Sequence, residues 1–174
     1  VLDGVPQTDP FGGWINWPAY DALALSEVRV TRGGGSVVHG PGALAGTIEL
    51  ASLLSDGVSS GLEVGSRDSV EARAMAGGSI ADGEVSLSVR AARGGGFIPV
   101  VARDRGAADR RAPYENAALR MRWVQPIGAD TELQTSISGF ADTRERGLAF
   151  SDNESRGSDL SARLVGRGRY QWSA

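Results

Sequence analysis

The sequence predicts a mainly β protein, in which about six antiparallel strands of the kind that form transmembrane barrels follow part of a small mixed α/β unit. Three observations support this fold class. Apolar and polar side chains alternate with period two from about residue 58. Tight turns and longer polar loops separate the alternating segments, and the first 55 residues are instead rich in proline and glycine turns. We therefore expect two parts, residues 1–55 and residues 56–174.

The first part has short β-like pieces between its turns. We expect these pieces at Val1–Val5, Glu27–Thr31 and Thr47–Ala51. Helical periodicity is hard to sustain here, and the best candidate for a helix is Ala19–Leu25, with two turns at most. The sequence therefore predicts a small, loop-rich unit with a little of both secondary structures.

The second part alternates clearly enough to place its strands. In Glu84–Arg93, for example, Val85, Leu87, Val89 and Ala91 fall on one face and Glu84, Ser86, Ser88 and Arg90 on the other. We expect longer polar loops at about 97–113 and 145–157. The expected strands lie near 58–66, 69–81, 84–96, 114–126, 131–144 and 158–173.

Alternation of this kind also builds soluble sandwiches, whose apolar face is an ordinary core. Three features favour a membrane barrel instead. The apolar face is rich in alanine and glycine, which would make a thin core. The polar face carries paired arginines, Arg120 with Arg122 and Arg167 with Arg169. The alternating segments are also longer than soluble strands, which average about 5 or 6 residues.

Aromatic residues lie where a membrane barrel would need them. Trp123 comes just before a tight turn, and Tyr170 and Trp172 fall near the end of the last expected strand, which would run in the same direction. Together they would form part of an aromatic girdle at one membrane interface.

The composition excludes several classes of site. The net charge of -3 gives no reason to expect a nucleic-acid partner. The absence of cysteine excludes disulfides, zinc–thiolate sites and cysteine nucleophiles. No stretch approaches the roughly 18 apolar residues of a membrane helix, and no signal peptide is visible.

Catalytic and nucleotide motifs are also not supported. Residues 40–45 fit the letters of the dinucleotide fingerprint, but a strand-like segment follows at once where a helix is required. The chain has no lysine, so it cannot contain a P-loop. The only histidine, His39, is expected to be structural, and Asp152–Glu154 is expected to be a solvated loop tip. We expect no enzyme activity, no cofactor and no metal site.

Five segments of residues 1–52 carry a resemblance to a family. In order along the chain they are Val1–Pro6, Asp9–Gly13, Val28–Gly33, Ser36–Gly40 and Ala43–Leu50. They resemble the second half of the plug domain of TonB-dependent outer-membrane receptors, and the alternating strands follow where the barrel of such a receptor would begin. The resemblance implies a plug folded inside a barrel, in which the glycines allow close backbone approach.

The resemblance also implies a function. Members of this family take up scarce nutrients across the outer membrane of Gram-negative bacteria, most often iron–siderophore chelates or cobalamin. The uptake is driven by the TonB energy-transducing complex through an N-terminal TonB box, and the nutrient, the complex and outer-membrane lipid would be the partners. The chain would then be a fragment that lacks the TonB box, the first half of the plug and most of the barrel.

The resemblance places candidate sites on this sequence. The segment 6–17 would be an apical plug loop that faces the ligand, although its tryptophans could instead anchor the loop to the barrel wall. The loop after residue 96 could add weaker contacts to an anionic ligand, and Arg32 would pair with the barrel. The candidate ligand contacts are Asp9, Phe11, Trp14, Asn16 and Trp17 in the plug loop, and Phe97, Arg103 and Arg105 in the outer loop.

Two other functions remain open from the sequence. A passive porin or an autotransporter barrel would have similar strands but no plug-like first part. A soluble β-rich binding protein would bury the apolar face that a membrane protein exposes to lipid.

Overall fold

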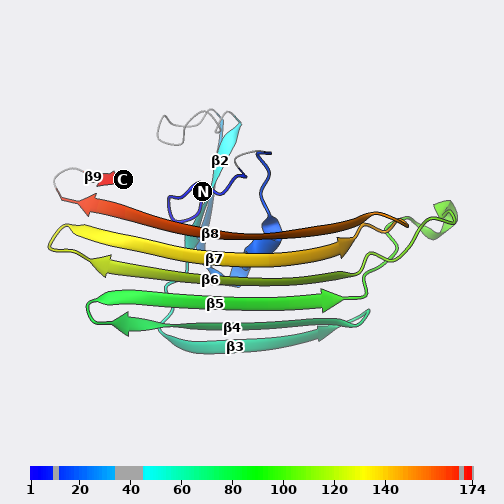
Figure 1. Ribbon diagram of the computed structural model, residues 1–174, viewed down its shortest axis with the longest axis horizontal. Helices are drawn as coiled ribbons and strands as arrows, with labels where there is room; N and C mark the ends of the chain where they lie inside the picture. The colour runs from blue at the N-terminus through cyan, green and yellow to red at the C-terminus, as the bar shows by residue number, and fades with distance from the viewer. Residues whose placement is uncertain (10–11, 34–44, 169–170, 174) are drawn as a thin grey trace.

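The computed structural model describes residues 1–9, 12–33, 45–168 and 171–173. The described chain is mainly β, with antiparallel sheets and three short 3₁₀ turns. A two-stranded sheet pairs β1 (Leu25–Arg32) with β2 (Gly46–Ser52). The larger sheet has seven strands in sequence order, and it is open, with β3 and β9 at its edges (Figure 1). Its strands are β3 (Gly57–Gly65), β4 (Ser69–Ile80), β5 (Gly83–Gly94), β6 (Tyr114–Pro126), β7 (Thr131–Glu145), β8 (Asp152–Arg167) and β9 (Gln171–Ser173).

The strand predictions for the second part are confirmed, except at the last strand. Strands β3 to β7 agree with the expected segments to within two residues at each end. The expected long loop at 145–157 is wrong, because β8 begins at Asp152 and continues the pairing with β7 as far as Glu145. The expected strand 158–173 is also wrong, because β8 ends at Arg167 and the short β9 pairs back against it.

The expected helix at Ala19–Leu25 is wrong as well. Two 3₁₀ turns, η1 (Trp17–Ala19) and η2 (Ala22–Ala24), replace it, and the chain is extended between them at Tyr20 and Asp21. The side chain of Asp21 accepts a hydrogen bond from the backbone of Leu23 at 3.0 Å. A side chain that bonds locally in this way favours a cap and a short turn over a continuous helix.

The first residues form a tight turn and not an extended strand. Leu2 and Val5 exchange two backbone hydrogen bonds of 2.9 Å each. Asp3 and Gly4 between them have φ angles of 50° and 83°. Two successive positive φ angles are the pattern of a type I′ turn, for which Asp-Gly is a preferred sequence. Two backbone hydrogen bonds of 2.9 Å join the turn to β2. The N–H of Asp3 donates to the carbonyl of Leu50, and the N–H of Leu50 donates to the carbonyl of Val1.

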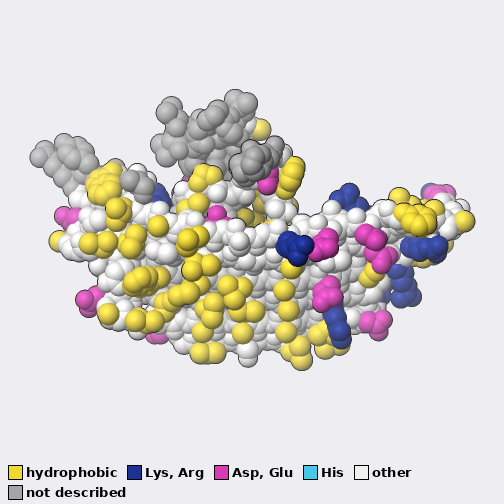
Figure 2. Space-filling view, in the orientation of Figure 1, with side chains coloured by type: hydrophobic (Ala, Val, Ile, Leu, Met, Phe, Trp, Pro, Cys, Tyr) yellow, Lys and Arg dark blue, Asp and Glu magenta, His cyan; other side chains and the backbone are white. Residues whose placement is uncertain are grey.

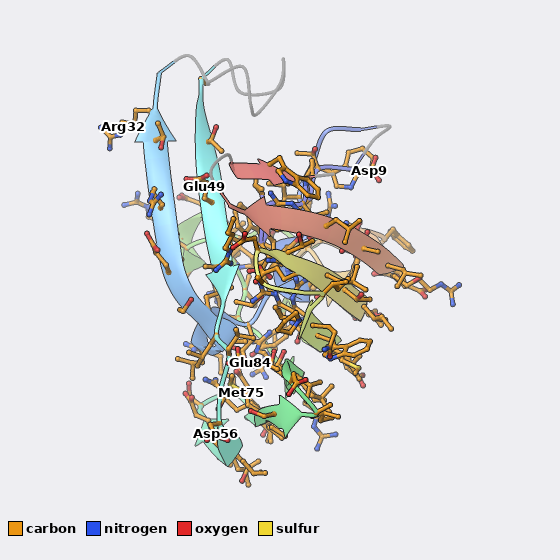
Figure 3. The ribbon with its side chains drawn as sticks, turned by 90° about the vertical axis from the view of Figure 1, so that its left-hand side faces the viewer. Asp9, Arg32, Glu49, Asp56, Met75 and Glu84 are labelled. Carbon is orange, nitrogen blue, oxygen red and sulfur yellow. The ribbon has the colours of Figure 1, made fainter. Side chains whose placement is uncertain are left out.

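The seven-stranded sheet has two chemically different faces. We call residues 1–55 the N-terminal unit. Its described part lies against one face of the sheet, which we call the inner face (Figure 3). In register across the strands, Ser88, Arg120, Ser138 and Asp159 share this face. The alternate positions form the outer face, where apolar side chains follow one another across the strands (Figure 2). Examples in register are Ala76, Leu87, Met121, Ile137 and Leu160.

The apolar part of the outer face is a band of limited length along the strands. On β7 it runs from Leu133 to Ala141, which is about 27 Å at about 3.4 Å per residue. Beyond it, toward the longer connections, the register brings together the charged side chains of Arg93, Glu115 and Glu154. Figure 2 shows the same change from apolar side chains in the middle to charged ones at that end.

The tryptophans predicted for the girdle lie on the outer face. Trp123 is in register with Val85 and Thr135. Trp172 is in register with Gly166, and its indole covers the position where a Cβ on Gly166 would lie. Trp172 therefore reaches this face from β9 and not from the end of β8. Tyr170 lies outside the described residues.

The two connections at the charged end of the sheet are hydrogen-bonded to each other. Residues 95–113 join β5 to β6, and residues 146–151 join β7 to β8. Asp109 and Leu148 form a β-bridge. Arg110 donates its backbone N–H to Gly147 at 2.8 Å, and Ala149 donates to Ala108 at 3.0 Å. The connections form one hydrogen-bonded extension of the sheet.

Candidate functional site

In the described residues, the hydrogen bonds and ion pairs between the N-terminal unit and the inner face are concentrated at the turn of Asp3 and Gly4. The Asp3 carboxylate accepts a hydrogen bond from Arg120 at 3.0 Å and lies 3.6 Å from Nε of Arg122. The Asp3 carbonyl accepts a hydrogen bond from Arg163 at 3.2 Å. Within the unit, the carboxylate also accepts the backbone N–H of Ser52 at 2.8 Å and its hydroxyl. We call Asp3 with Arg120, Arg122 and Arg163 the arginine clamp.

The clamp is largely shielded from solvent. The side chain of Asp3 is 9% exposed, and those of Arg120 and Arg122 are 16% and 13% exposed. Leu2, next to Asp3, is fully buried. Charge-assisted hydrogen bonds in such surroundings are stronger than those at an open surface, so the clamp fixes the unit on the sheet.

A pocket of about 260 Å³ lies beside the clamp, between the N-terminal unit and strands β6 to β8. Asp9, Asn16 and Tyr20 line it from the unit. The strands contribute Arg120, Ser138, Phe140, Arg156 and Asp159 to its walls. An aromatic ring beside groups of both charges suits a polar ligand that has a ring or an extended chain.

Tyr20 is fixed at the edge of this pocket. Its hydroxyl donates a hydrogen bond to the Gln7 side chain at 2.9 Å. Burial raises the pKa of the Tyr20 phenol above its usual value, Arg120 opposes this and Asp159 adds to it. Tyr20 therefore remains a neutral hydrogen-bonding group at physiological pH.

The predicted plug-loop residues do not all lie together. Asp9 and Asn16 line the same pocket, and Asp9 also accepts the backbone N–H of Gly12 at 2.7 Å. Trp14 folds back over Gly12 and remains 58% exposed. Trp17 is 54% exposed and meets Tyr20 edge to face, with ring centroids 6.3 Å apart. Phe11 lies outside the described residues.

The predicted outer-loop residues lie in the connection 95–113, and none of them lines this pocket. Phe97 lies under the guanidinium of Arg67, 5.7 Å from the ring centroid. Arg103 lies 3.3 Å from the Asp104 carboxylate. Arg105 donates to the carbonyl of Val100 at 2.9 Å. These contacts are within the loop itself or with the neighbouring turn.

Arg32 lies at the end of β1 and makes no ion pair with the described residues. Its side chain points away from the seven-stranded sheet, on the side opposite Asp9 (Figure 3). Among the described residues, the ion pairs between the N-terminal unit and the sheet are made by Asp3.

A second polar network lies farther along the inner face. Nε and Nη2 of Arg90 bind the two Glu71 carboxylate oxygens at 2.9 Å each, and Nη1 binds Asn116 at 3.3 Å. Arg73 also pairs with Glu71. This network holds the neighbouring strands β4, β5 and β6 together through their polar side chains. The described residues contain no group of histidine or acidic side chains placed to hold a metal ion.

No family model matches the chain, and a search of curated proteins finds no match. No helix in the described parts of the chain is both long enough and apolar enough to cross a membrane.

Proposed function

We propose that this chain is part of a TonB-dependent outer-membrane receptor. Residues 1–55 would be the second half of its plug domain, and residues 56–174 the first strands of its barrel. The receptor would take up a scarce nutrient actively, such as an iron–siderophore chelate or cobalamin, and would perform no covalent chemistry. In this proposal the open edges at β3 and β9 pair with further strands that close the barrel.

The observation that carries the proposal is which face the N-terminal unit covers. It lies on the polar inner face and leaves the apolar outer face uncovered, so that Leu160, for example, is 72% exposed. A soluble two-layer protein buries its apolar face against the second layer. The uncovered band of about 27 Å along β7, on a strand tilted by about 35–45°, would span roughly 20 Å across a membrane, close to the apolar band of about 25 Å of outer-membrane barrels.

The contact between unit and sheet also suits a plug that must move. Among the described residues only Leu2 and Ala92 are buried hydrophobic residues. The unit is held mainly by hydrogen bonds and ion pairs, which water can replace when the unit shifts. The pocket that contains Asp9 and Asn16 lies at this contact, where a bound nutrient would sense both parts.

Adjacent serines on β3 give a direct test of the membrane assignment. Ser59 is on the inner face with Met75, and Ser60 is on the outer face with Ala74, and both are exposed. The chain has no cysteine, so Ser59→Cys and Ser60→Cys can each carry one fluorophore. In membranes, we expect brominated lipid to quench the label at Ser60 and aqueous iodide to quench the label at Ser59. Quenching of both labels by iodide and of neither by lipid would identify a soluble protein.

A second test separates active uptake from passage through a passive porin. A strain that lacks the protein is expected to grow poorly when one nutrient is scarce, with ferric siderophore, cobalamin and carbohydrate tested in turn. A protonophore is expected to abolish the uptake of that nutrient by the parent strain. Uptake that continues after the protonophore is added would support a porin and overturn the proposal.

A further inference from the structure

The arginine clamp brings together more positive charge than Asp3 can neutralise. Three guanidinium groups, from β6 and β8, meet one carboxylate and one carbonyl. In the described part of the chain, Asp3 is the only partner of Arg122 and Arg163. The Nε of Arg120 is buried and has no hydrogen-bond partner there. Because each guanidinium has five N–H donors, most of the donors in the cluster have no protein partner among the described residues.

The position of the Asp3 carboxylate is that of a bound ligand. It lies between guanidinium groups of the sheet on one side and the N–H and hydroxyl of Ser52 on the other. Its own residue is in a positive-φ conformation of 50°, which the tight turn imposes. A carboxylate that is not part of the chain could make the same contacts without this turn.

Arg120 also connects the clamp to the neighbouring pocket. Its Nη2 binds Asp3, and the same side chain lines the pocket with Arg156 and Asp159. An anionic group in the pocket could therefore draw Arg120 away from Asp3.

We propose that Arg120 and Arg122 form a carboxylate-binding site on the inner face, that Asp3 is its internal occupant, and that an external carboxylate can replace Asp3, whose backbone carbonyl Arg163 also holds. Replacement would release the turn at residues 2–5 from the sheet, so binding of an anion would loosen the N-terminal unit. The contacts are within this chain, so the inference does not depend on the membrane assignment.

Hydrogen exchange in the full-length protein tests this inference, with acetate as the probe. The amides of Asp3 and Leu50 report on the turn, because they bond to β2 and to Val1 and not to the carboxylate itself. Asp3→Ala is expected to speed their exchange about tenfold, the effect of losing about 1.4 kcal/mol from charge-assisted hydrogen bonds. Asp3→Asn keeps the shape and is expected to give a smaller increase. Asp56→Ala, in the exposed connection before β3, is the matched control and is expected to change nothing.

Acetate is expected to act with opposite signs in the two proteins. It should slow exchange in Asp3→Ala by filling the empty site. It should speed exchange in the wild type by competing with Asp3, at concentrations above about 10 mM because the tethered carboxylate has a high effective concentration. Chloride at equal ionic strength should do neither.

The inference requires that acetate slow exchange in Asp3→Ala only when Arg120 and Arg122 are present. In Asp3→Ala combined with Arg120→Gln and Arg122→Gln, acetate is expected to have no effect. Three results would each overturn the inference. Acetate could slow exchange equally with and without the arginines, it could change exchange in the same direction in Asp3→Ala and in the wild type, or exchange in Asp3→Ala could be the same as in the wild type. If Asp3→Ala does not fold, the wild-type acetate titration decides by itself.

Discussion

Leu119→Arg is expected to lower the free energy of unfolding in a lipid bilayer by about 2–4 kcal/mol, the cost of an arginine at mid-membrane on a lipid-facing strand. Leu119 lies in the middle of the apolar band, in register with Val89 and Gly139. Its side chain is 44% exposed, and no charged group of the described residues neighbours it on this face. Denaturant unfolding of the protein in lipid vesicles measures the change.

Glu115→Arg is the matched control for this substitution. Glu115 is on the same strand and the same face, but in the charged row with Arg93. An arginine there should cost only about 0–1 kcal/mol, as expected near the interface. Equal effects at the two positions would show that depth in a bilayer does not matter, and the membrane proposal would then be wrong.

Gly77→Val is expected to destabilise the fold by about 1–3 kcal/mol, as overpacking of a filled site does. Gly77 is on the inner face of β4, where the connection from the N-terminal unit to β3 crosses the sheet. A Cβ on Gly77 would overlap the carbonyl oxygen of Ser55 and lie 3.0 Å from that of Val85. Both obstacles are backbone atoms, which cannot rotate away. The same denaturant experiment measures the loss.

Gly78→Val tests whether the close approach, and not the branched side chain, causes this loss. Gly78 is the next residue, with its Cβ position on the outer face, and the nearest atom there is the Asp56 carboxylate at 3.7 Å. Valine is a good strand former, so little change or a small gain is expected. A loss as large as that of Gly77→Val would point to a general need for glycine in this part of β4.

The alternation of side chains was sufficient to predict strands β3 to β7, because those strands have one apolar and one polar face along most of their length. It failed at the start of β8, where Asp152–Gly157 is almost entirely polar. Its first four residues, Asp152–Ser155, pair with β7 beyond the apolar band, so no burial selects their side chains. Apolar and polar residues also alternate past Arg167, so the pattern predicted one strand to residue 173. The chain instead turns back into β9, and alternation alone does not reveal such a change of strand.

The candidate site was predictable only in part. The resemblance placed Asp9 and Asn16 in one loop, and both line the pocket. Alternation placed Arg120 and Arg122 on the polar face. Their partner, Asp3, is 117 residues from Arg120 in the sequence, and no local pattern connects them. Asp3-Gly4 is a preferred sequence for a tight turn, and the prediction of a β-like segment at Val1–Val5 did not take it into account. Which wall residues meet the loop, such as Phe140 and Arg156, depends on the packing of the whole sheet.

The bonded connections 95–113 and 146–151 have a consequence for recognition from outside. Arg110 with Gly147, and Ala149 with Ala108, join segments that are distant in the sequence into one surface. A synthetic peptide copied from either segment would lose these partners and would not keep the folded shape. An antibody raised against such a peptide is therefore expected to miss the intact protein, whereas one raised against the folded molecule would need both segments at once.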